Sequence, residues 1–77
     1  MATARLHRLC DCARGARVCV RALEGDAAEC ARLRALGLVE GAEVDVLETG
    51  IVWVLRVRGA RLALARAVAE RIGVSVG

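Results

Sequence analysis

The chain has 77 residues and a mass of 8.1 kDa, enough for one small domain. Hydrophobic residues make up 57% of it, too many for a disordered chain, yet its longest uncharged run, 49–55, is far shorter than the roughly 20 residues of a membrane-spanning helix. Twelve arginines, no lysine and nine acidic residues leave a net charge of +3, too small and too dispersed to indicate nucleic-acid binding.

The first predicted element is a β-strand over 17–23, where branched residues alternate with polar ones. A helix is expected next, over about 26–36. Asp26 and Glu29 have the spacing of a capping box at its start, and Gly37 supplies the left-handed residue at its end. The residues predicted to form the buried stripe of this helix are Cys30, Leu33 and Leu36.

Short strands and turns follow the helix. Strands are expected over 43–47, 51–58 and 62–64, then a short helical segment over about 65–72 and a last strand over 74–76. Trp53 alternates with Leu55 and Val57, which favours a place in the core over the alternative, a place at the rim of a binding groove. A sheet this small buries one apolar face best by curling into a barrel, which also removes exposed edges.

The predicted fold class is therefore mainly β, a small β-barrel with one well-capped helix (about 26–36) and one short helical segment (about 65–72). Residues 1–8 are expected to be a flexible N-terminal extension, and residues 9–77 to be a single domain. The N-terminus has no apolar core leading to a cleavage site, so no secretory signal is expected.

Four segments in order resemble the ferrous iron transport protein A (FeoA) family. Residues 9–15, LCDCARG, are similar to its opening L-x-D-L-x-P-G, and residues 32–47 to its central R-L-x-x-L-G-L-x-x-G-x-x-V-x-V. Residues 56–64, RVRGARLAL, resemble its V-R-G-x-x-L-A-L, and residues 69–74 its closing A-x-x-I-x-V. The departures are a shorter connection at Glu48–Gly50, without proline, Arg14 in place of a proline, and Cys12 where the family usually has a core leucine.

The resemblance implies an SH3-like small β-barrel and an accessory role in bacterial ferrous iron uptake. The partner it implies is the FeoB transporter, a membrane protein with a cytosolic GTP-hydrolysing domain. We therefore expect a cytoplasmic protein that reaches the membrane only through its partner, binds no nucleic acid and is permitted, but not required, to form a homo-oligomer. The same barrel occurs as the C-terminal domain of iron-dependent repressors, so a free-standing relative of that domain is an alternative.

The four cysteines are expected to be reduced thiols, either in the core or incidental. Cys10 and Cys12 are the candidates for the main alternatives, a redox pair or a metal-binding or metal-sensing site, with His7 as a third ligand. Their one-residue separation is tighter than the C-x₂₋₄-C spacing of tetrahedral sites, so no metal site and no cofactor are expected. Cys10 is expected to be the most exposed of the four.

The predicted functional surface is the outer face of the hairpin strand together with the turn that follows it. It combines two valines with three arginines, which suits contact with a protein better than with nucleic acid. The predicted partner-binding residues are Val52, Val54, Arg56, Arg58 and Arg61. The sequence contains no nucleophile beside a histidine, no metalloprotease motif and no phosphate-binding glycine loop, so the protein is not expected to be an enzyme.

Overall fold

A computed structural model of the chain describes residues 7–76. The elements in chain order are β1 (His7–Arg8), the 3₁₀ turn η1 (Leu9–Asp11), β2 (Arg17–Leu23), α1 (Ala27–Ala35), β3 (Glu43–Glu48), β4 (Val52–Val57), β5 (Ala60–Ala65), α2 (Arg66–Ala69) and β6 (Ile72–Val76). No helix described over this range is long and apolar enough to cross a membrane.

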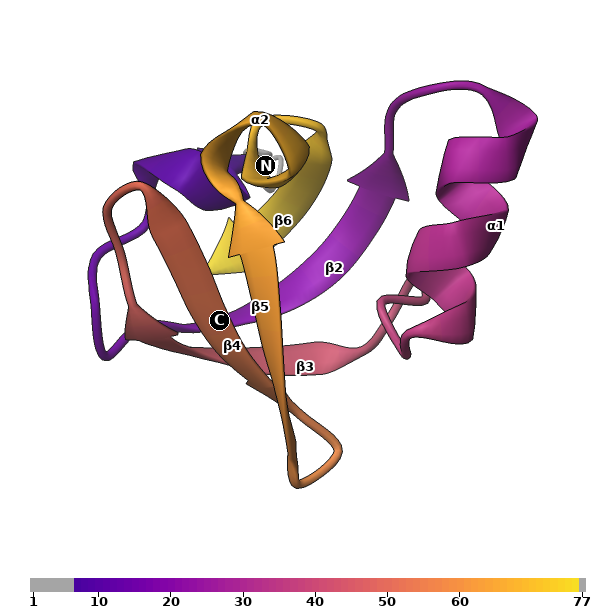
Figure 1. The fold of residues 1–77 in the computed structure, drawn as a ribbon. Helices are drawn as coiled ribbons and strands as arrows, with labels where there is room; N and C mark the ends of the chain where they lie inside the picture. The colour runs from indigo at the N-terminus through magenta and orange to yellow at the C-terminus, as the bar shows by residue number, and fades with distance from the viewer. Residues whose placement is uncertain (1–6, 77) are drawn as a thin grey trace, which may run out of the picture.

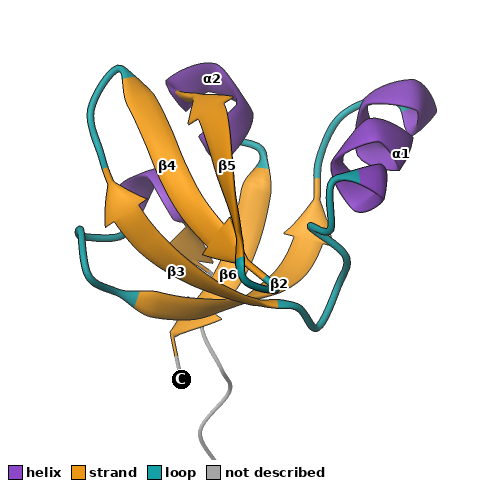
Figure 2. Ribbon diagram, turned by 60° about the horizontal axis from the view of Figure 1, so that its bottom comes forward, coloured by secondary structure: helices purple, strands orange, loops and turns teal. Residues whose placement is uncertain are grey.

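All six strands form one antiparallel sheet in the order β1-β6-β2-β3-β4-β5. The sheet curls around its apolar face (Figures 1 and 2), which confirms the mainly β, small-barrel fold. Closure is incomplete, because the ladder ends at β1 on one side and β5 on the other, and these two strands do not pair over residues 7–76. The sheet therefore keeps two edges where full closure of the barrel would have removed both.

The side chains at alternate positions of the strands point inward and fill the interior of the barrel. On β4 the predicted inward residues Trp53, Leu55 and Val57 are all buried, which confirms the core position of Trp53. The other strands contribute their own inward-facing residues at every second position. The buried members of the core cluster that come from β2, β3, β5 and β6 are Val18, Val20, Val44, Val46, Leu64, Ile72 and Val74.

Both ends of α1 are capped, although the capping box is only half formed, because the Glu29 side chain pairs with Arg71 and not with the Asp26 amide. Asp26 accepts a hydrogen bond from the Glu29 amide at 2.8 Å, and Leu38 folds back so that its amide reaches the Leu33 carbonyl at 3.0 Å. The predicted buried stripe is correct for Cys30 and Leu33 but wrong for Leu36, which is 47% exposed. The reason is that α1 lies to one side of the sheet (Figure 1), so only part of its surface is covered.

The chain ends differ from the prediction in extent. His7 and Arg8, expected in the flexible extension, form β1 and pair with Val74 and Gly73 of β6; the rest of the predicted extension, 1–6, lies outside the described residues. The second helical segment is present but covers only Arg66–Ala69. The two ends of the predicted segment lie in strands instead, because Ala65 ends β5 and Ile72 begins β6.

Candidate protein-binding surface

The five residues predicted to bind a partner lie together on and beside the β4–β5 hairpin. Val52 is 51% exposed, Val54 is half-buried and the arginines at 56, 58 and 61 are exposed. The two strands pair without interruption from Val52↔Ala65 to Val57↔Ala60, so alternate residues of both share one outer face. Arg58 and Gly59 form the turn with φ of 53° and 81°, the left-handed pair typical of a two-residue hairpin.

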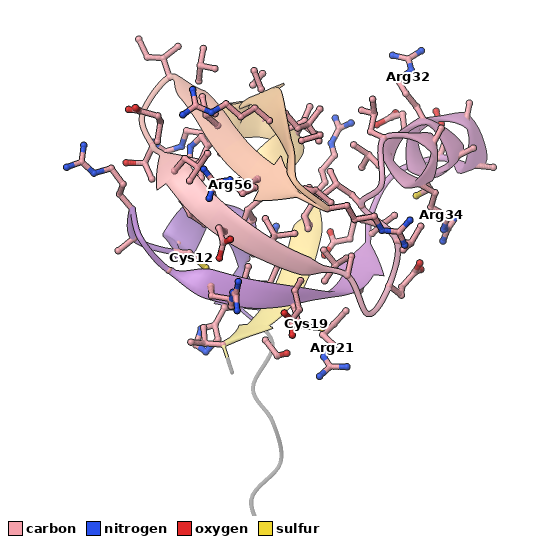
Figure 3. The ribbon with its side chains drawn as sticks, turned by 90° about the horizontal axis from the view of Figure 1, so that it is seen from below. Cys12, Cys19, Arg21, Arg32, Arg34 and Arg56 are labelled. Carbon is pink, nitrogen blue, oxygen red and sulfur yellow. The ribbon has the colours of Figure 1, made fainter. Side chains whose placement is uncertain are left out.

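A row of charged side chains crosses four strands on this outer face. The registers place Arg17 of β2 opposite Asp45 of β3, Asp45 opposite Arg56 of β4, and Arg56 opposite Arg61 of β5. The row therefore reads positive, negative, positive, positive, and ends on two arginines at the edge of the sheet. Figure 3 shows Arg56 on the sheet, well apart from Arg32 on α1.

Asp45 forms its ion pair with Arg17 of β2 and not with Arg56 of β4. Arg17 Nε donates to Asp45 Oδ1 at 3.0 Å, and Arg17 Nη1 lies 3.9 Å from Glu43 Oε1. The hydrogen bond to Asp45, reinforced by the charges of Asp45 and Glu43, raises the pKa of the Arg17 guanidinium. Among the ion pairs that residues 7–76 make, none includes an arginine of the hairpin. Within this range the hairpin arginines therefore form no ion pair, although Asp45 lies opposite Arg56 in the ladder.

A hollow of about 320 Å³ lies where the charged row meets the hairpin turn. Its lining residues are Arg17, Glu43, Asp45, Arg56, Arg58 and Gly59. At the other end of the face the hairpin strands are apolar, because Val54 lies opposite Ala63 and Val52 opposite Ala65, and the neighbouring Ile51 is 90% exposed. On the β3 side, the exposed Glu48 lies opposite Val54. Apolar area beside arginine is the composition that protein interfaces favour.

The sequence missed part of this surface. Arg17, Asp45 and Ala63 share the face with the predicted residues, yet they come from strands whose register depends on the fold. The position of Ala63 on this face could have been predicted from the sequence. A two-residue turn at Arg58–Gly59 fixes the register of the hairpin, and alternation along 60–65 then places Ala63 on the outer face. No local pattern could have brought Arg17 beside Asp45.

A second hollow, of about 270 Å³, lies between α1 and α2 and was also missed by the sequence analysis. Leu33 and Val68 form its apolar part, and Glu29 pairs with Arg71 at its margin. Arg32 completes the lining. Over residues 7–76, Arg32 makes no ion pair, so this hollow carries one unpaired arginine where the hairpin hollow carries two, Arg56 and Arg58.

Cys10 and Cys12 flank Asp11 and are both half-buried against the core. Cys19 is half-buried as well, and Cys30 is buried. Burial, followed by the charge of Asp11, raises the pKa of both the Cys10 and Cys12 thiols. A raised pKa keeps a thiol protonated near neutral pH, and a protonated thiol is a poor metal ligand and nucleophile.

The neighbourhood of these cysteines offers no ligand cluster. Within the part of the chain that the structure describes, no three histidine, cysteine or acidic side chains come close enough to hold a metal ion. The Cys12 Sγ instead donates weakly to the Arg8 carbonyl at 3.6 Å. His7, the expected third ligand of the alternative, is exposed and paired in the sheet with Val74.

Comparison with known proteins identifies the family. The FeoA domain model matches residues 7–76. The crystal structure of an iron uptake regulatory protein (FeoA) is similar with a TM-score of 0.85 and 26% identity, over 92% of this chain and 97% of that chain. The FeoA protein from Chlorobium tepidum has a TM-score of 0.85 and 32% identity, over 91% of this chain and 70% of that chain.

A manganese-dependent transcriptional repressor shares the fold with a TM-score of 0.88 and 17% identity, over 100% of this chain and 45% of its own. Identity that low shows a common fold and nothing further. None of the curated proteins compared with this chain matches it. The FeoA model covers nearly the whole described range, and the Chlorobium tepidum protein agrees with it. This chain belongs to the FeoA family, and that membership implies a role in ferrous iron transport.

Proposed function

We propose that this protein is a small, non-enzymatic accessory protein of bacterial ferrous iron uptake that works in the cytoplasm by binding the cytosolic GTPase region of a FeoB-type transporter. Family membership supports the iron-uptake setting, and structurally similar proteins are described as an iron uptake regulatory protein and as iron(II) transport protein A. The single observation that carries the contact is the hairpin face, where exposed valine lies beside arginines without acidic partners over residues 7–76.

The chemistry of this face specifies the kind of partner. Val52 and Val54 supply apolar area for the centre of an interface, while Arg56, Arg58 and Arg61 supply donors around it. The docking surface of the partner should therefore be acidic with an apolar centre. Attachment to the membrane would follow from the transporter, and no direct lipid or nucleic-acid contact is needed.

The test is an amide-shift titration of the isotope-labelled, reduced protein. The GTPase domain of the transporter is added to one sample and ferrous iron to another. We expect saturable shifts confined to the β4–β5 hairpin, 52–65, with the domain and none with iron. Silence with the domain, together with saturable shifts around Cys10 and Cys12 at stoichiometric iron, would replace the proposal with a metal-handling protein.

The free-standing repressor-like alternative has its own readout in the same experiment. A winged-helix protein of the iron-dependent repressor class is added to a third sample. Under the proposed function it leaves the spectrum unchanged. Shifts with that protein and none with the GTPase domain would assign the chain to the regulatory alternative.

A further inference from the structure

β5 is an edge strand whose free side has no backbone partner. Ala60–Ala65 pair with β4, and no further strand follows β5 in the sheet. Within residues 7–76, the backbone hydrogen bonds made outside the strand ladders and helices do not involve residues 60–65. An edge of this kind presents a row of unpaired N–H and C=O groups, which is a template for another strand.

The outer-face side chains of β5 beyond Arg61 are small. Ala63 and Ala65 are exposed on the outer face, and the strand contains no proline. The β4–β5 register is continuous, whereas the β2–β6 and β3–β4 ladders each contain a shift. The opposite edge, β1, has two residues within the described part of the chain. Between the two edges, β5 is therefore the one with the length and regularity to accept a strand.

The charged row specifies the partner strand. It ends with Arg56 opposite Arg61, and like charges directly opposite each other destabilise a strand pair. A strand added beside β5 would place a side chain opposite Arg61, and a carboxylate there would neutralise the end of the row. Beyond Arg61, the same face offers Ala63 and Ala65, which suit apolar branched neighbours.

A second copy of this chain is a poor occupant of the same edge. The sequence of β5 is ARLALA, which contains one arginine and no acid. Two β5 strands paired with each other would therefore bring more positive charge to the row and no carboxylate. The complementary occupant is an acidic segment from another protein.

We propose that β5 binds an extended acidic segment by strand addition, with a carboxylate opposite Arg61 and apolar residues opposite Ala63 and Ala65. This inference rests on the proposed function, since it takes the segment to belong to the transporter's cytosolic region. It adds the mode of recognition: main-chain hydrogen bonds give affinity, and the alternate side chains on the outer face give selectivity.

The experiment uses capped synthetic peptides as probes and amide hydrogen exchange of the full chain as readout. The peptides are Val-Thr-Val-Thr-Glu for antiparallel addition and Glu-Thr-Val-Thr-Val for parallel addition, each with a counterpart in which lysine replaces glutamate. We expect one glutamate peptide at millimolar concentration to slow exchange within 60–65. Its lysine counterpart should bind on the order of tenfold more weakly.

Variants of the protein with reversed charge test whether Arg61 sets the preference for the glutamate peptide. Arg61→Glu should reverse the preference so that the lysine peptide binds better, whereas Arg32→Glu, which makes the same charge change on α1, should leave the preference unaltered. Exchange within 60–65 that stays unchanged with both glutamate peptides overturns strand addition. Equal protection by the glutamate and lysine peptides would also overturn the proposal. Protection that is present without peptide and disappears on dilution would overturn it too, because it would indicate that a second copy of the chain occupies the edge.

These outcomes are separate from those of the proposed function. Domain binding without any peptide effect at β5 would leave the transporter contact standing and remove the strand-addition mode. Peptide binding at β5 without domain binding would retain the strand site and refute the transporter as its source.

Discussion

At the scale of single residues, Trp53 holds a polar atom that the fold leaves without a partner. Its ring is 4% exposed, and its Nε1 makes no hydrogen bond within the described part of the chain. A buried donor without a partner costs about 1–3 kcal/mol. Its inward neighbours on the same strand, Leu55 and Val57, are also buried, so the indole lies on the apolar face of the sheet.

Trp53→Phe should therefore be mild for so large a core residue. It removes the unpaired N–H while keeping an aromatic ring, so we expect the free energy of unfolding to fall by less than about 1.5 kcal/mol. Trp53→Ala, the control for lost volume, should lower it by about 3–5 kcal/mol. Denaturant unfolding followed by circular dichroism measures both, and equal losses would show that the N–H carries no penalty.

Gly37 has both a conformational and a steric reason to be glycine. Its φ is +101°, and a Cβ there would lie 3.3 Å from Val57 Cγ1 in the core. Gly37→Ala should destabilise the protein by about 2 kcal/mol. Gly41 has a similar φ of +91° with open space around it, so Gly41→Ala isolates the conformational part at about 1 kcal/mol. The two variants would lose equal stability if the contact with Val57 were unimportant.

Glu40 provides a pH-dependent contribution to stability. Arg34 donates to it from Nε at 3.3 Å and from Nη2 at 2.9 Å, and this hydrogen bonding lowers the pKa of Glu40 to about 2. Because the folded pKa lies below the unfolded one, the contribution is complete above the ordinary glutamate pKa and is lost as the pH falls towards 2. Glu40→Gln should therefore show a shallower fall in stability between about pH 4.5 and 2 than the wild type. Parallel pH profiles for the two proteins would contradict this assignment.

At the scale of elements, the outer face of the β4–β5 hairpin contains an unfavourable pair of like charges. Arg56 and Arg61 lie directly opposite each other, so Arg61→Glu turns a repulsive cross-strand pair into an attractive one. We expect the free energy of unfolding to rise by about 0.5 kcal/mol while affinity for an acidic partner falls. Arg32→Glu on α1 is the control for affinity alone and should leave it unchanged, because an acid in the last turn of the helix lowers stability by itself. A loss of stability in Arg61→Glu would show that the two guanidiniums do not repel.

Local patterns account for most of the elements. The helix α1 could be predicted at both ends because its signals, Asp26, Glu29 and Gly37, lie within a turn of the residues they cap. The hairpin face could be predicted because period-two alternation and a tight turn define the face and register together. The five predicted residues therefore came together without knowledge of the rest of the fold.

Long-range pairing accounts for what the sequence did not reveal. His7 and Arg8 became a strand because β6, more than sixty residues later, lies beside them. The helical segment predicted over about 65–72 is only a single turn, because Ala65 pairs with Val52 in β5 and Ile72 pairs with Leu23 in β6. The link from Arg17 to Asp45 and the hollow between α1 and α2 likewise exist only once the chain has folded.

At the scale of the whole molecule, the barrel presents two unlike sides. On the side of α1 and α2, Arg71 is paired with Glu29, whereas the three arginines of the hairpin make no ion pair over residues 7–76. A partner recognised through the hairpin should consequently bind more weakly as ionic strength rises. The central claim is that this hairpin face binds the GTPase region of the transporter.

The measurement that tests this claim most directly is the dissociation constant of the GTPase domain for the wild type, Arg56→Glu and Arg32→Glu. Both substitutions make the same charge change at exposed positions, one on the hairpin and one beside the α1–α2 hollow. We predict that Arg56→Glu weakens binding by about tenfold or more and that Arg32→Glu stays within about twofold of the wild type. Equal affinities for all three proteins, or a loss confined to Arg32→Glu, would contradict the account and move the contact off the hairpin.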